Sequence, residues 1–315
     1  TSRDVVVLRE TTYNVLATVS LLTIAPPLWR LRRETRSTTM SSAADWSVVA
    51  FVGWSLALAV DWLSGATETR WSDQLWYTAC VLTLTPFTAA LGAKRPGTRV
   101  WSVFVIVPLI LVLEWPAVSH WDGTWPPGRL VLESPALAAM GLVLVMGTGN
   151  YLGTRYAWPV LGIACGIPLL LAPLSEHAFH WAFPAEFWRA TACGCLALSI
   201  LRIRWKSARR PPQTGLERVW TDFRDLYGIA WARRVQEQIN TTAHQEHWTI
   251  RLDFQGLVQE SGAPADTLSA LDMSRIERAL RWSLRRFVDP GWITARLGSQ
   301  DLAATTLDSG EGIQA

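Results

Sequence analysis

Residues 46–64, WSVVAFVGWSLALAVDWLS, contain a single charged side chain, that of Asp61. A helix of about 20 mostly apolar residues is long enough to cross the hydrocarbon layer of a bilayer, because each residue adds about 1.5 Å. This segment therefore predicts a transmembrane helix. The number of similar segments in the rest of the chain then decides the fold class.

Six other segments have a similar length and apolar composition. Half of the 315 residues are hydrophobic and only 17% are charged, which is unlike a disordered chain or an ordinary soluble domain. We therefore predict an all-α polytopic membrane bundle of about seven transmembrane helices within residues 1–210. The predicted spans are residues 13–29, 46–64, 74–93, 99–118, 134–152, 156–174 and 185–204.

The loop charges predict the orientation of the bundle, because Lys and Arg in short loops stay on the cytoplasmic side. Basic residues follow the first, third, fifth and seventh spans, whereas the other loops are mainly acidic. The prediction is a multi-pass protein of a bacterial inner (plasma) membrane, N-out and C-in. The orientation of the other six helices does not change if residues 13–29 do not fully span. Thirteen of the 19 tryptophans lie near the predicted span ends, as expected at a membrane interface. The basic residues that follow the first, third, fifth and seventh spans are Arg30, Arg32, Arg33, Arg36, Lys94, Arg95, Arg99, Arg155, Arg202, Arg204, Lys206, Arg209 and Arg210.

The chain becomes polar after the last predicted span. Residues 211–298 predict a small cytoplasmic α+β module of the order helix, strand, helix, because residues 215–240 have helical periodicity and residues 247–258 alternate between polar and apolar. Residues 299–315 contain few large apolar groups and predict a disordered tail.

The last predicted helix of the module has a basic face opposite an apolar stripe. Such a face can bind the anionic headgroups of the inner leaflet or an acidic protein partner. We predict that it contacts the membrane surface or a partner. Its arginines are Arg275, Arg278, Arg281, Arg285 and Arg286.

Two groups of residues on the predicted outer side are candidates for chemistry. His177 and His180 would share one face if helical, and with a carboxylate such as Glu114 they could bind a divalent metal. The alternative is an interfacial aromatic segment that binds no metal. Asp61 and Glu114 are also candidates for a polar site within the membrane, because charge is costly there.

Several functional classes lack their usual residues. No histidine lies in the middle of a predicted span to hold a buried haem, no lysine lies there to bind retinal, and no phosphate-binding loop is present. We therefore expect no cofactor. The net charge of +3 is too small and too dispersed to predict nucleic-acid binding.

These patterns favour an integral membrane protein that is a non-catalytic subunit or scaffold, whose cytoplasmic module binds a protein partner or a second copy of the chain. Two alternatives remain open. One is a transporter or channel component that uses Asp61 and Glu114, and the other is a membrane-embedded enzyme with a metal site at His177 and His180.

Overall fold

A computed structural model of the chain describes residues 2–64, 70–119, 130–176, 183–208, 215–259 and 270–297. This part of the chain is mostly helical, and each predicted span lies largely within helical structure. The helical elements of the bundle are α1 (Ser2–Glu34), α2 (Ser41–Ser64), α3 (Arg70–Leu91), α4 (Thr98–Trp101), η1 (Ser102–Ile106), α5 (Val107–Ser119), α6 (Ser134–Gly149), α7 (Ala157–Leu171), η2 (Ala172–Leu174) and α8 (Ala185–Ala208).

Three helical stretches of the described residues are long and apolar enough to cross a membrane, which indicates a membrane protein. They are α2, the continuous stretch Ser102–Ser119 and the stretch Ala157–Leu174. The apolar helix α6 has only 16 residues. By this measure α1, α3 and α8 do not qualify, and α3 and α8 carry charged residues such as Asp73 and Arg189. The structure thus supports fewer spanning helices than the seven predicted from the sequence.

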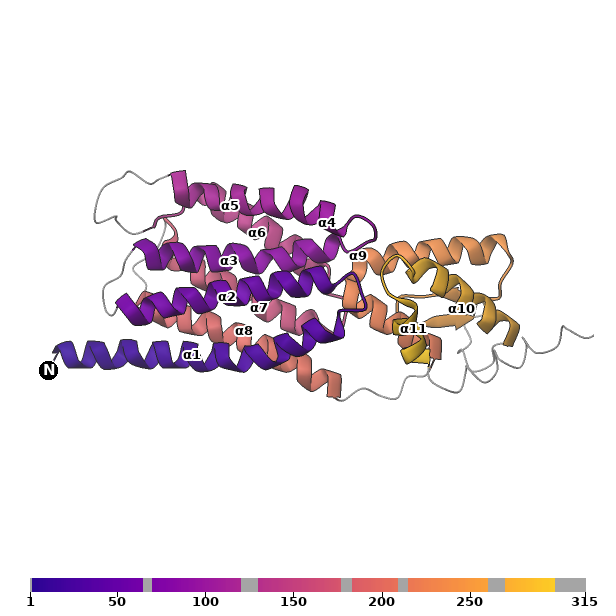
Figure 1. Cartoon of the computed structure of the whole chain (residues 1–315), viewed down its shortest axis with the longest axis horizontal. Helices are drawn as coiled ribbons and strands as arrows, with labels where there is room; N and C mark the ends of the chain where they lie inside the picture. The colour runs from indigo at the N-terminus through magenta and orange to yellow at the C-terminus, as the bar shows by residue number, and fades with distance from the viewer. Residues whose placement is uncertain are drawn as a thin grey trace, which may run out of the picture.

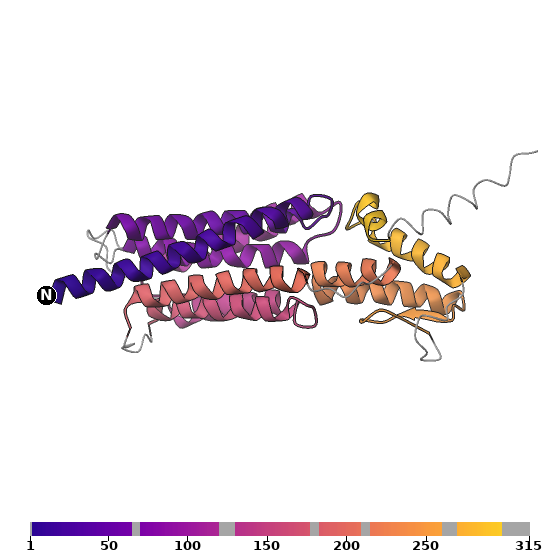
Figure 2. The same ribbon diagram turned by 90° about the horizontal axis from the view of Figure 1, so that it is seen from below.

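The helices of the bundle lie side by side along the long axis of the molecule in two layers (Figures 1 and 2). One layer contains α1, α2 and α3, and the other contains α7 and α8, with α1 packed against both α2 and α8. Buried side chains from the two layers interdigitate to form the bundle core. They include Leu21, Trp54, Trp76, Leu144 and Ile167.

The outward face of the stretch Ser102–Ser119 is apolar. Phe104 is 73% exposed and Trp115 is 67% exposed, whereas Leu113 and Ala117 are buried against neighbouring helices. Soluble proteins rarely expose large contiguous apolar patches. This face therefore suits contact with lipid.

A small module continues the long axis at one end of the bundle (Figure 1). Its two short strands form an antiparallel sheet in which Arg251 lies opposite Val258, so the module has the predicted α+β content. The predicted tail, residues 299–315, lies outside the described residues. The elements of the module are α9 (Gly215–Gln245), β1 (Ile250–Leu252), β2 (Leu257–Gln259), α10 (Ala270–Leu284) and α11 (Pro290–Leu297).

The prediction of one strand over residues 247–258 is wrong. The chain turns back after Leu252, where the backbone N–H of Asp253 donates to the carbonyl of Gly256 at 2.7 Å. Two short strands pair across this turn. Alternation identified the buried Ile250 and Leu252 correctly, but the same pattern continued through the turn.

The core of the module extends into the bundle. Trp220, Phe223 and Tyr227 of α9 belong to one hydrophobic cluster with side chains from α3 and η1, such as Ala90 and Ile106. The end of the bundle and the module therefore share buried surface.

Candidate functional site

The structure brings no complete metal site together within the residues it describes. His177 and His180, the predicted ligands, lie outside the described ranges. Glu114 of α5 is described, and its Oε2 accepts a hydrogen bond from Gln74 Nε2 of α3 at 3.0 Å. Across residues 2–64, 70–119, 130–176, 183–208, 215–259 and 270–297, no group of three His, Cys, Asp or Glu side chains could hold a metal ion.

Asp61 lies in a buried ion-pair network near the carboxyl end of α2. This end of α2 is the one away from the module (Figure 1). The carboxylate of Asp61 lies 3.2 Å from Arg189 Nη1 of α8, and it accepts hydrogen bonds from the hydroxyl of Ser72 and from Trp76 Nε1. Arg189 Nη2 also donates to Asp73 Oδ1 at 2.8 Å. The network joins α2, α3 and α8, and a buried charge with such partners is strongly destabilised when one partner is removed.

Asp61 and Glu114, the two predicted intramembrane acids, do not converge. Both contact α3, but Asp61 accepts hydrogen bonds from Ser72 and Trp76, whereas Glu114 accepts one from Gln74. Positions 72 and 76 share one helix face, and position 74 points almost the opposite way. The two carboxylates are therefore on different sides of α3.

The arginines of the predicted basic face have different neighbours. Arg281 is paired with Glu277 one helical turn earlier, at 2.7 Å. The guanidinium of Arg285 lies 4.8 Å from the centre of the Trp282 ring, and Arg286 is exposed beyond the end of α10. Arg281 and Arg285 therefore contact other residues of the module itself.

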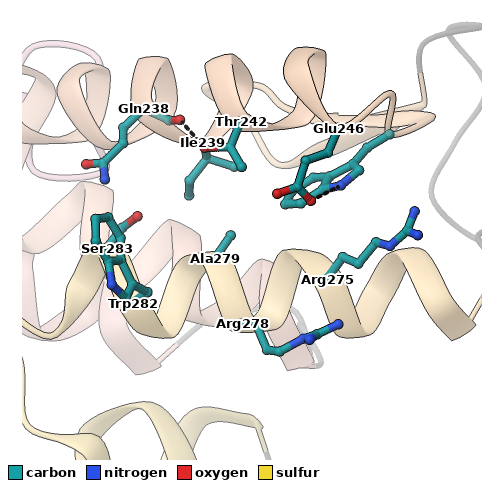
Figure 3. Close-up of a pocket in the computed structure, with 10 residues that line it drawn as sticks. Gln238, Ile239, Thr242, Glu246, Arg275, Arg278, Ala279, Trp282 and Ser283 are labelled. Carbon is teal, nitrogen blue, oxygen red and sulfur yellow. Dashed lines mark hydrogen bonds between the residues drawn. The ribbon is translucent and has the colours of Figure 1, made fainter.

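The other two arginines line a groove of about 310 Å³ between the second half of α9 and α10 (Figure 3). Ile239 is buried at its base, and the ring of Trp282 is 53% exposed at one end. Arg275 extends from α10 toward the other end, on the side of Glu246 of α9, and Arg278 runs along the opposite edge of α10 (Figure 3). The groove therefore combines an apolar floor with a basic rim.

A break in α9 fastens the module to the bundle. Gly228 has φ 78° and ψ −177°, a conformation that essentially only glycine adopts, and it interrupts the helical hydrogen bonds. Hydrogen bonds to Asn150, which lies between α6 and α7, replace the interrupted helical ones. The Oδ1 of Asn150 accepts from the N–H of Ala230 at 2.9 Å, its Nδ2 donates to the carbonyl of Tyr227, and its own carbonyl accepts from the N–H of Ile229.

Two more loops of the bundle bind the module through backbone hydrogen bonds. The N–H of Thr39 donates to the carbonyl of Phe287 at 2.8 Å, and the N–H of Arg95 donates to the carbonyl of Arg286 at 2.9 Å. Arg95 also forms an ion pair with Asp289 at 2.6 Å. We call these contacts, together with those of Asn150 to α9, the joint.

Aromatic side chains of α9 complete the joint. The hydroxyl of Tyr227 donates to the carbonyl of Phe287 at 2.7 Å and lies 3.0 Å from Thr39 Oγ1, while Trp231 Nε1 donates to the carbonyl of Ala90 at 3.1 Å. Burial raises the pKa of Tyr227 to about 12. This phenol therefore remains protonated in the folded protein well above the ordinary range.

Ion pairs continue the joint on the side of the loop between α6 and α7. Asp225 Oδ2 lies 3.4 Å from Arg155 Nε, and Asp225 Oδ1 lies 3.0 Å from Arg224 Nη2. Asp222 pairs with Arg296 of α11 at 2.9 Å, and burial lowers the pKa of Arg296 below its usual value. The two aspartates hold α11 and the loop of Arg155 against α9.

Sequence reasoning missed Asn150 and Gly228. An isolated glycine inside the helical pattern of residues 215–240 was the available signal, since such a glycine is unfavourable in a helix unless it has a packing role. Nothing in the local sequence paired it with an asparagine from a loop far earlier in the chain. Arg189, near the start of the predicted span 185–204, is the buried partner of Asp61, and no local pattern singled it out.

Comparison with known proteins finds no matching family model, curated protein or solved structure.

Proposed function

We propose that the chain is an integral membrane scaffold, N-out and C-in, whose cytoplasmic module is held as a fixed platform for a protein partner. The apolar stretches and the exposed Phe104 and Trp115 support the membrane part of this proposal. Basic loop residues at the module end, among them Arg95 and Arg155, support the orientation.

The joint is the observation that carries the platform proposal. Three separate loops of the bundle, represented by Thr39, Arg95 and Asn150, form backbone hydrogen bonds with the module. A module on a free linker would need none of them. Because each loop binds a different part of the module, a partner bound there keeps a defined position relative to the membrane helices.

The alternatives receive less support from the described residues. A transport pathway through Asp61 would have to disrupt its ion pair with Arg189. An outer metal site would need His177 and His180, of which the geometry is not described. The scaffold proposal uses contacts that the fold already makes.

The orientation is tested with two reporters fused after Ala315. We expect green fluorescent protein to fluoresce there and alkaline phosphatase to be inactive, since the first matures only in the cytoplasm in this assay and the second only outside it. An active phosphatase with a dark fluorescent protein would refute the proposed orientation.

The platform is tested by placing a photocrosslinking amino acid at exposed module positions in the full-length chain, in membranes of its native source. Arg233, Arg251 and Trp282 are suitable because they are exposed on different elements. We expect at least one position to form a crosslink with another polypeptide. If none of them captures a protein, the module is no platform.

A further inference from the structure

The groove between α9 and α10 has the character of a docking site for one side of an amphipathic segment. Its base is apolar, because Ile239 is 1% exposed and Trp248 is 7% exposed. The large ring of Trp282 stays 53% exposed beside it, although the buried aromatic residues of the module pack against one another. Exposed tryptophans next to an apolar pocket are frequent anchors in protein interfaces.

The charge on the rim specifies the chemistry of the occupant. Arg275 and Arg278 line the groove from α10, and the cation of Arg285 lies over Trp282. Across from them, the carboxylate of Glu246 accepts a hydrogen bond from Trp248 Nε1 at 2.9 Å, and its one negative charge is outnumbered by the positive charges of the three arginines. The α10 side of the groove is therefore complementary to carboxylates.

The position of α10 favours a protein over the membrane surface as the occupant. The end of α10 lies at the bundle, where the carbonyl of Arg286 accepts from Arg95. Both views show α10 running away from the bundle along the long axis (Figures 1 and 2). Arg275 precedes Arg285 by ten residues, which places it roughly 15 Å farther from the bundle along the helix.

We propose that this groove binds an acidic amphipathic helix of a partner protein. Its apolar side chains would lie on Ile239 and Trp282, and its carboxylates would face Arg275 and Arg278. This is the common mode in which one helix lays its apolar face into a groove between two others. The inference rests on the proposed platform function, and it adds the site and the chemistry of the partner.

The test uses a photocrosslinking amino acid in place of Ala279, at the groove, in the full-length chain and in membranes of its native source. Mass spectrometry then identifies the captured peptide. We expect a segment with net negative charge and apolar residues at helical spacing. Adding Arg275→Glu and Arg278→Glu should lower the yield about tenfold, because like charges across an interface repel.

The matched control is the pair Arg233→Glu and Arg251→Glu, which changes the net charge equally at exposed positions outside the groove. It should leave the yield at Ala279 unchanged. An equal loss in both pairs, capture of lipid, capture of a second copy of the chain, or no capture at Ala279 would each overturn the groove proposal.

The groove proposal can fail without the platform proposal. Capture of a protein from Arg233 or Arg251 but not from Ala279 refutes only the groove. Capture from none of the module positions refutes both.

Discussion

Arg189 Nη2 of α8 donates to Asp73 Oδ1 of α3 across 2.8 Å, between residues 116 positions apart in the chain. The same guanidinium contacts Asp61 of α2. One cation thus holds together three helices at the end of the bundle farthest from the module. Its neighbours are also aromatic, since the Trp76 ring lies 5.7 Å from the guanidinium.

Replacing Arg189 with methionine should destabilise the bundle strongly. The substitution keeps much of the side-chain volume but leaves Asp61 and Asp73 buried without their shared cation. Breaking a buried ion pair in this way costs about 3–5 kcal/mol. Thermal unfolding of the purified protein in detergent measures the loss.

The matched control is Arg202→Met, which removes an exposed arginine from the same helix. It should change the free energy of unfolding by less than about 0.5 kcal/mol. Equal melting temperatures for the two variants would show that the network contributes nothing to stability.

Gly228→Ala should weaken the joint. A Cβ at this position would lie 2.3 Å from Asn150 Nδ2, and the backbone conformation itself costs about 1–3 kcal/mol for residues other than glycine. We expect faster hydrogen exchange in α9 and a lower melting temperature. Gly291→Ala in α11 is the control, because its Cβ would meet nothing within 4 Å, and it should be close to neutral.

Asn150→Ala should also destabilise the protein, by about 1–3 kcal/mol, because it leaves the buried carbonyl of Tyr227 and the partly buried N–H of Ala230 without their partner. The effects of Asn150→Ala and Gly228→Ala should not add, since the amide of Asn150 is the group that the new Cβ would strike. Unfolding of both single variants and the double variant provides the comparison. Strict additivity would contradict the direct contact.

Because of Tyr227, we expect the folded protein to lose stability at alkaline pH. The pKa of the Tyr227 phenol is raised to about 12 by burial in the folded protein, against an ordinary value near 10 when unfolded. Below pH 10 both states are protonated and the contribution is complete; between pH 10 and 12 only the unfolded state ionises, so stability falls. The expected loss is about 1–2 kcal/mol at pH 11.

Tyr227→Phe is the control for this titration. It should lower stability at neutral pH by about 1 kcal/mol through the lost hydrogen bond to the carbonyl of Phe287, and it should flatten the alkaline decline. Denaturant unfolding at pH 8, 10 and 11 separates the two effects. An identical alkaline decline in both proteins would assign it to other groups.

The helical bundle could be predicted from local composition, because a helix long enough to span a membrane, such as residues 46–64, is visible in the sequence as a long apolar run. The hairpin could not be placed, because Ile250 and Leu252 alternate with polar residues as one longer strand would. The short helix α11 could not be predicted either; Pro290 follows the end of α10 and begins α11, where its missing N–H is harmless.

The contacts that define the site depend on residues far apart in sequence. Asp61 was recognisable as an unusual charge in an apolar run, but its partner Arg189 was not, because hydropathy carries no information about which helices are neighbours. The same holds for Asn150 and Gly228. The basic face of α10 was predicted from periodicity, whereas the groove beside it exists only once α9 is in place.

The hydrophobic cluster that joins Trp220 and Phe223 to Ala90 and Ile106 sets an order on biogenesis. The module is synthesised after the bundle, and part of the surface that it must cover belongs to helices that precede it in the chain. The bundle therefore acts as a template for the last segment of the chain. Released from the bundle, the module would expose to water the apolar side chains, such as Trp220 and Phe223, that this cluster buries.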